Sequence, residues 1–157
     1  GITLLALVNN EPQLLGLKEI LQHHIDHRKV VITRRTQYDL EQARARVHLL
    51  EGLLIALNNI DPVIAGIKQS RTVDDARAFL IRTYSFSEEQ AKAILELRLQ
   101  KLASLEQEKI KDEHRELLVK IDYYLEILGS VQKVLSIIKR NFDKWTVFSV
   151  RFHIKSE

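Results

Sequence analysis

The sequence predicts a mainly α-helical protein with a short N-terminal β-hairpin and a long antiparallel two-helix coiled coil that carries a small helical domain. Three observations lead to this prediction. Turn-forming residues are scarce, with 5 glycines and 2 prolines in 157 residues. Charged residues make up 29% and apolar residues 45%, a mixture that suits long helices with one solvated face. Two separate stretches repeat apolar residues at alternating intervals of three and four, as paired helices do.

The composition also excludes several kinds of site. The sequence has no cysteine, so disulfides, thiolate metal sites and a cysteine nucleophile are ruled out. It has no methionine, and we interpret it as a piece of a longer protein. The net charge of +3 permits a nucleic-acid partner without demanding one. No apolar run approaches the roughly 20 residues that span a bilayer, and the apolar start lacks the basic leader of a signal peptide.

Residues 1–16 are predicted as the end of a β-sheet. Aliphatic and β-branched residues run from Ile2 to Val8, turn-forming residues follow at positions 9–12, and Gln13 to Leu15 returns as a short second strand. Two strands alone are marginally stable, so we expect this sheet to continue in residues outside the chain.

The stretch from about Leu17 to Asn59 is predicted as one helix. Its second half has a seam, by which we mean a stripe of apolar residues along one face. The seam residues are Leu40, Ala43, Val47, Leu50, Leu54 and Leu57. A second seam consists of Ile110, His114, Leu117, Ile121, Tyr124 and Leu128, and Gly129 follows as a stop signal. Because a seam requires a partner helix, we expect residues 17–59 and 104–128 to form an antiparallel stalk, with Leu57 near Gln107 and Leu40 near Tyr124.

Residues 60–103, called the knob below, are predicted to hold three short helices. Asp61 with Pro62 is expected to cap the first helix, Thr72 the second, and Ser87 with Gln90 the third. Because each helix has its own cap, we expect the knob to be independent of the stalk seam. After the stalk, residues 129–143 are assigned to a further helix that ends near Arg140, and residues 144–157 are left unassigned.

Three separated stretches resemble a known family. They are RKVVITRRTQYDLEQARARVHLLEGLLIALNNIDPVI from Arg28, SEEQAKAILELRLQKLASLE from Ser87 and KIKDEHRELLVKI from Lys109. Together they closely resemble the A subunit of bacterial-type DNA gyrase, which is the breakage-reunion subunit of a type IIA topoisomerase. The resemblance covers about residues 1–140, and residues 33–36 and 97–102 are more similar to gyrase than to topoisomerase IV. The A subunit of topoisomerase IV and a non-enzymatic coiled-coil interaction module are the alternatives.

The resemblance implies a role for each part of the chain. Residues 1–16 would close the tower region beside the DNA gate, and the knob would be a dimerisation domain that forms the exit gate for the transported duplex. The parent enzyme would be a cytoplasmic homodimer that works with the B subunit of gyrase, double-stranded DNA, ATP and Mg²⁺, without a membrane. The family's catalytic tyrosine follows an arginine, and none of Tyr38, Tyr84, Tyr123 and Tyr124 has that context. We therefore expect no catalytic residue and no cofactor in this fragment, which alone would not be an enzyme.

Four basic residues form a candidate DNA phosphate contact. They are Arg28, Lys29, Arg34 and Arg35, and no acid lies between His27 and Tyr38. Such a cluster can follow a phosphate backbone, although a solvated helix face or pairing with acids elsewhere is the alternative. The nearby His23, His24 and His27 have no third ligand of clear geometry, so we expect no metal site.

A helix beginning near Ser87 supplies the candidate dimer interface. Its apolar residues cover nearly every side of the helix, and a small domain has little interior in which to bury them all. We therefore expect a contact with a second subunit through Gln90, Ala91, Ile94, Leu95, Leu97, Arg98 and Leu102. The alternative is a helix at the centre of its own small core.

Overall fold

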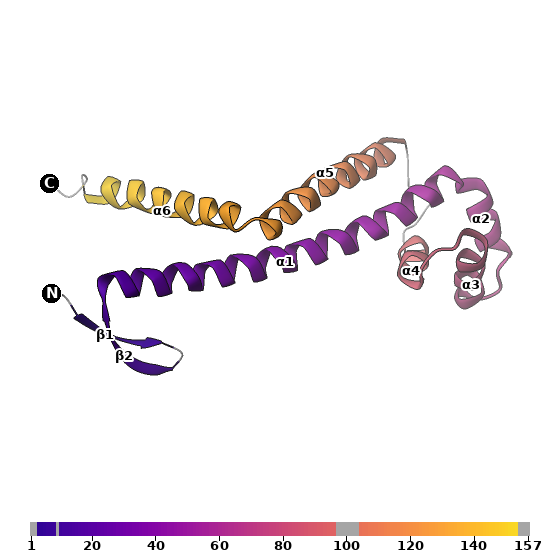
Figure 1. The fold of residues 1–157 in the computed structure, drawn as a ribbon. Helices are drawn as coiled ribbons and strands as arrows, with labels where there is room; N and C mark the ends of the chain where they lie inside the picture. The colour runs from indigo at the N-terminus through magenta and orange to yellow at the C-terminus, as the bar shows by residue number, and fades with distance from the viewer. Residues whose placement is uncertain (1–2, 9, 97–103, 154–157) are drawn as a thin grey trace. The chain divides into compact units, whose positions relative to one another are not determined.

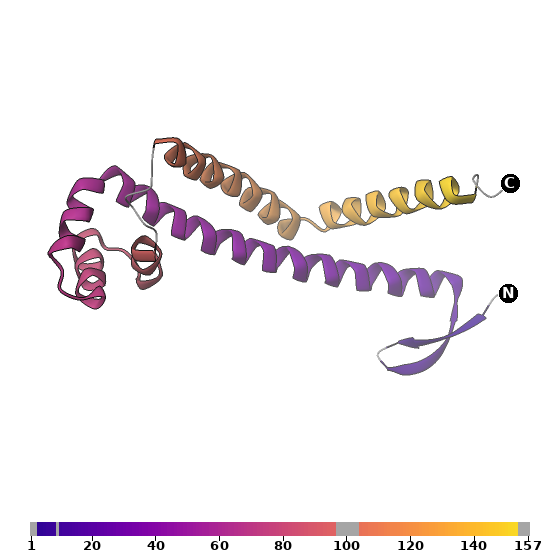
Figure 2. The same ribbon diagram turned by 180° about the vertical axis from the view of Figure 1, so that it is seen from behind.

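The computed structural model describes residues 3–8, 10–96 and 104–153 (Figures 1 and 2). Within these ranges the chain forms a two-stranded sheet followed by six helices, which confirms the predicted fold class. The chain divides into two compact units. Unit 1 combines residues up to Asp39 with residues from Tyr124 onward, and unit 2 consists of Leu40–Tyr123.

The predicted hairpin is present in unit 1. Strands β1 (Thr3–Val8) and β2 (Glu11–Gly16) pair antiparallel, with Thr3 opposite Gly16 and Val8 opposite Glu11. Asn10 lies between them with φ of 67°, a left-handed conformation that asparagine tolerates better than most residues. The second strand is longer than predicted, because it includes Glu11 and Pro12.

The long helix α1 (Leu17–Asn58) has nearly the predicted bounds. At its start the backbone N–H of Gly16 donates to the carboxylate of Glu19 over 2.8 Å, which satisfies one of the amides that a helix leaves unpaired. Within the described ranges no single helix is both long enough and apolar enough to cross a membrane. Only α1 and α2 (Ile60–Gln69) together meet those criteria, and they are bent by 92° at their junction.

Helices α5 (Ser104–Gly129) and α6 (Val131–His153) follow the knob. In unit 1, Ile127, Val134 and Ile138 form a buried cluster, against which Ile25 and Ile32 of α1 pack. The stop at Gly129 is confirmed, but no described glycine has positive φ. Ser130 instead begins the next helix, with its Oγ 3.3 Å from the backbone nitrogen of Lys133.

The predicted end of the last helix near Arg140 is wrong, because α6 continues to His153. Residues 144–153 are rich in β-branched and aromatic types. These types lower helix propensity only by fractions of a kcal/mol each. Without a glycine or proline in this stretch, nothing in the sequence stops the helix.

In unit 2 the knob and the stalk share one core. Helices α2, α3 (Val73–Tyr84) and α4 (Glu88–Glu96) confirm the three predicted knob helices. The buried cluster that joins them to α1 consists of Leu50, Leu53, Ala56, Val63, Leu80, Phe86, Ala91 and Ile94. Ile110 and Leu117 of α5 pack against the same cluster. The expectation that the knob is independent of the seam is therefore wrong, because Leu50 of the seam is also a core residue of the knob.

The first seam is confirmed as the buried face of α1. Five of its six residues are buried, and Leu54 is half-buried. Within unit 2, α5 runs beside α1 in the opposite direction, as Figures 1 and 2 show. The predicted register, with Leu57 beside Gln107, would place Glu51 beside position 113. In the structure Glu51 lies 3.8 Å from His114, which is one residue from that prediction. The proximity of Leu40 and Tyr124 stays a prediction.

Two of the three predicted caps are confirmed. The Oγ1 of Thr72 accepts a hydrogen bond from the backbone of Asp75 over 3.1 Å. Ser87 and Gln90 form a complete capping box at the start of α4. The cap at Asp61 is wrong, because α2 begins at Ile60 and its N-cap makes no side-chain cap hydrogen bond. Proline is still tolerated at position 62, since amides in the first turn have no partner within the helix.

Candidate functional site

The four basic residues of the candidate phosphate contact have different surroundings, all in unit 1. Lys29 binds Asp26 over 3.0 Å, and Arg35 lies 3.8 Å from Asp39. Hydrogen bonds from Gln22 and then Lys29 hold the pKa of Asp26 below its ordinary value. For Lys29 and Arg35 the structure therefore shows the alternative, pairing with acids elsewhere, and both acids lie just outside the stretch between His27 and Tyr38.

Arg28 and Arg34 are the two cations of the cluster for which the described part of the chain supplies no ion-pair partner. Among the residues that the structure describes, no carboxylate lies within ion-pair distance of either guanidinium. Arg34 is exposed, and Arg28 is half-buried. The candidate phosphate contact is therefore concentrated on these two residues.

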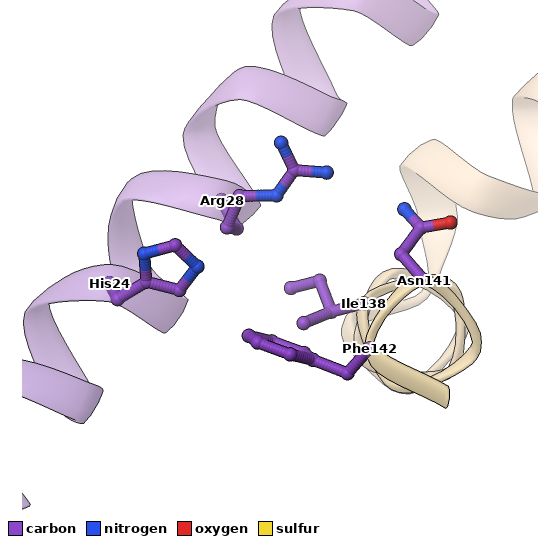
Figure 3. Close-up of a pocket in the computed structure, with 5 residues that line it drawn as sticks. All are labelled: His24, Arg28, Ile138, Asn141 and Phe142. Carbon is purple, nitrogen blue, oxygen red and sulfur yellow. The ribbon is translucent and has the colours of Figure 1, made fainter. Parts of the chain in front are cut away.

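Arg28 borders a hollow of about 330 Å³ between α1 and α6 (Figure 3). The hollow is lined by His24, Arg28, Ile138, Asn141 and Phe142. The rings of His24 and Phe142 meet edge to face, with their centroids 5.6 Å apart. A cation and an amide beside an apolar wall suit an anionic group with an apolar body. Nothing in the sequence analysis pointed to this hollow, because its two sides are more than 100 residues apart in the chain.

The histidines near this hollow do not assemble with other ligands. Within the described ranges, no three His, Asp or Glu side chains come together in an arrangement that could hold a metal ion. His24 instead contacts Phe142.

The residues predicted for the dimer interface are largely inside unit 2. Gln90 is 7% exposed, and Ala91 and Ile94 are fully buried within the chain's own core. These three side chains therefore have no surface to offer a second subunit in this conformation. For them the alternative of a helix at the centre of its own core is the better description. Leu95 is half-buried, and Leu97, Arg98 and Leu102 lie outside the described residues, so a subunit contact through those four stays a prediction.

Gln90 is instead the centre of a polar contact between α4 and α1. Its Nε2 donates to the backbone oxygen of His48 over 2.7 Å and lies 3.4 Å from His48 Nδ1. Its Oε1 accepts from the backbone of Ser87 over 3.0 Å. His48 Nε2 lies 2.9 Å from Ser87 Oγ. The sequence analysis found the Ser87–Gln90 half of this arrangement from its spacing, but no local pattern predicts a partner 42 residues away.

Ser87 and His48 have the separation of a nucleophile and its base, yet their hydrogen bonds oppose that role. Gln90 Nε2, which can only donate, lies 3.4 Å from His48 Nδ1, an arrangement that favours the ring proton on Nε2. A histidine with its proton on the nitrogen facing the serine cannot take the serine proton. Ser87 Oγ also accepts from the backbone N–H of Gln90 as a helix cap. This cluster is built to hold two helices together.

A paired Arg46 and Glu113 link α1 to α5 inside unit 2. The guanidinium donates from Nε to Oε1 over 2.7 Å and from Nη2 to Oε2 over 3.0 Å. The hydrogen bond from Arg46 is the main reason that the pKa of Glu113 lies below its ordinary value. A bidentate pair of this kind fixes the orientation of both side chains as well as their distance.

Comparison with known proteins identifies the family. A family model for the A subunit of DNA gyrase and topoisomerase IV matches residues 1–143. The chain belongs to this family. The resemblance drawn from the three motifs is thereby confirmed.

The curated relatives support the gyrase side of the family. The A subunit of DNA gyrase from Clostridium acetobutylicum is 51% identical over 144 residues, or 92% of this chain, and that from Brachyspira hyodysenteriae is 47% identical over the same share. The gyrase protein of the same name from Staphylococcus epidermidis is 43% identical over 152 residues, so its alignment continues past residue 143. The chain spans 17% of the length of each of these relatives.

Proposed function

We propose that this chain is the stalk and exit-gate part of the DNA breakage-reunion subunit of an ATP-dependent type II topoisomerase of the gyrase kind. The match of residues 1–143 to the family carries the proposal. The parent protein would be cytoplasmic and would act with a second copy of itself, with double-stranded DNA and with the B subunit of gyrase. ATP and Mg²⁺ would act elsewhere in that enzyme, so this part of the protein has a mechanical role.

The construction of unit 2 supports a mechanical role. Four fully buried large side chains, Leu50, Val63, Leu80 and Ile94, come from α1, α2, α3 and α4 respectively. Gly66 of α2 lies so close to the ring of Phe79 of α3 that a β-carbon there would overlap it. Because four helices of unit 2 share one closely packed core, unit 2 can transmit force without a change in its internal contacts.

The homodimer is the part of the proposal that can be measured directly. The fragment should sediment and scatter light as a species of about twice 18.3 kDa. A gate of stable type buries on the order of 1,600 Å² in total. Because α4 keeps Gln90, Ala91 and Ile94 inside its own chain, we expect Leu95 and the residues that follow it to supply the contact.

A matched pair of variants tests this location. Leu95→Asp should convert the dimer to a monomer at micromolar concentration, since a charge would enter an apolar contact. Lys92→Asp, on the exposed side of the same helix, should leave the mass unchanged. Circular dichroism of both variants checks that the helices remain. A wild-type fragment that stays monomeric at high micromolar concentration would rule out the gate assignment.

A further inference from the structure

The side chain of Gln90 makes more hydrogen bonds than a helix cap alone requires. A capping box needs only the reciprocal bonds between Ser87 and Gln90. Gln90 makes those bonds, and its amide nitrogen also donates to the backbone oxygen of His48 in a different helix and lies 3.4 Å from the His48 ring. One side chain therefore serves the start of α4 and the middle of α1 together.

The side chain of Gln90 packs closely against Gly52 of α1. Gly52 lies one helical turn after His48, and a β-carbon there would be 2.8 Å from Gln90 Cγ and 2.9 Å from Gln90 Cδ. Any residue larger than glycine at position 52 would push this side chain away from α1. The glycine thus creates the space that lets α4 approach the helix closely enough for the hydrogen bonds to form.

We propose that Gln90 is a positioning residue that fastens α4 to α1, so that the knob moves with the stalk helix as one body. This deepens the proposed gate function and rests on it for its meaning in the parent enzyme. With α4 fastened in this way, the exit gate opens by movement of unit 2 as a whole. It does not open by α4 swinging away from α1.

Replacement by glutamate separates the two tasks of this side chain. Gln90→Glu keeps an acceptor for the backbone of Ser87, and glutamate is itself a favoured residue at this position of a capping box. An ionised glutamate has no hydrogen to donate, so the hydrogen bond to the backbone oxygen of His48 is lost while the cap remains. The variant therefore removes the fastening without removing the start of the helix.

Amide hydrogen exchange on the whole fragment measures the effect. In Gln90→Glu, exchange in α4 and around residues 48–52 should rise about ten- to a hundredfold, while exchange in α3 changes less than about twofold. Unchanged exchange in α4 would overturn the proposal. A uniform rise throughout unit 2 would also overturn it, because that pattern means general loss of stability.

The state of His48 gives a second readout that general packing would not change. Nitrogen NMR shifts of the His48 ring should differ between the wild type and Gln90→Glu, because Gln90 Nε2 lies 3.4 Å from His48 Nδ1. Identical His48 ring shifts in the two proteins would contradict the proposed contact.

A double-mutant cycle tests the role of Gly52. Gly52→Ala should be strongly destabilising alone but much less so in a Gln90→Ala background, where the crowded Cγ and Cδ are absent. Strictly additive effects would show that the two residues do not act on each other and would sink the proposal. Light scattering on the wild type runs in parallel, so a monomeric fragment with the expected local exchange would reject the gate function alone.

Discussion

Leu50 is the residue at which the shared core of unit 2 can be tested most directly. It lies in the α1 seam and is fully buried, and it belongs to the same cluster as Val63, Leu80 and Ile94 of the knob. Leu50→Ala removes three carbons from the middle of this cluster without adding charge. If the knob and stalk share one core, loss of packing at Leu50 must weaken both.

The expected magnitude follows from complete burial. Replacement of a fully buried leucine by alanine costs about 2–5 kcal/mol, the transfer free energy of the lost carbons plus that of the cavity left behind. We expect about 3 kcal/mol here, since α1, α3 and α4 hold the cavity walls in place. Ile55→Ala provides a control in the same helix, because Ile55 is 44% exposed and its truncation should cost less than about 1 kcal/mol.

Urea unfolding followed by circular dichroism gives the free-energy difference, and amide exchange shows where it acts. In Leu50→Ala, exchange should rise in α2, α3 and α4 as well as in the neighbouring part of α1. A cost no larger than that of Ile55→Ala would refute the reasoning from burial. Faster exchange confined to α1 and α5 would show that the knob has an independent core after all.

Three further measurements address the charges and the chemistry. The pKa of Glu113 is lowered in the folded state, so its pairing with Arg46 contributes stability above about pH 4 that is lost as the pH falls through the folded pKa. Both side chains are more than a third exposed, so Glu113→Gln should cost less than about 1 kcal/mol at pH 7. The cost should shrink as the pH falls through the folded pKa, and a cost that does not change with pH would contradict this account. Binding of duplex DNA can be followed by fluorescence anisotropy at several salt concentrations. Arg34→Gln should reduce the salt dependence of binding by about one phosphate contact, and Arg35→Gln should reduce it by less because Asp39 shares the charge of Arg35. Equal salt dependence for the wild type and both variants would exclude a phosphate contact at these residues. The fragment should form no covalent adduct with plasmid DNA, with or without ATP and Mg²⁺, and an adduct would mean that one of its own tyrosines can act as the nucleophile.

Periodic and local features of this fold could be predicted from the sequence. The seam at Leu40–Leu57, the capping box at Ser87 and the hairpin depend on residues close together in the chain, and each is present in the structure. The position of Gln90 illustrates the limit. Its spacing from Ser87 predicted a cap, but its burial depends on Gly52 and His48, which only the tertiary fold brings to it.

The candidate site was predicted less completely, for related physical reasons. The apolar residues on most sides of α4 indicated a helix that must be buried. Their periodicity cannot tell whether they are buried by the same chain or by another. The charge cluster was found from its run of basic residues. Its partial neutralisation by Asp26 and Asp39 depends on helical spacings of three and four that cross the ends of that run.

Unit 1 is built from both ends of the chain, and unit 2 from the continuous stretch between them. A ribosome therefore delivers every residue of unit 2 before the second half of unit 1 exists. Once unit 2 has folded, the stretch between the two halves of unit 1 is no longer a long flexible loop. The conformational entropy lost when the two halves of unit 1 come together is therefore smaller. We expect the order of synthesis to become the order of folding, with the outer halves joining only after the middle is complete.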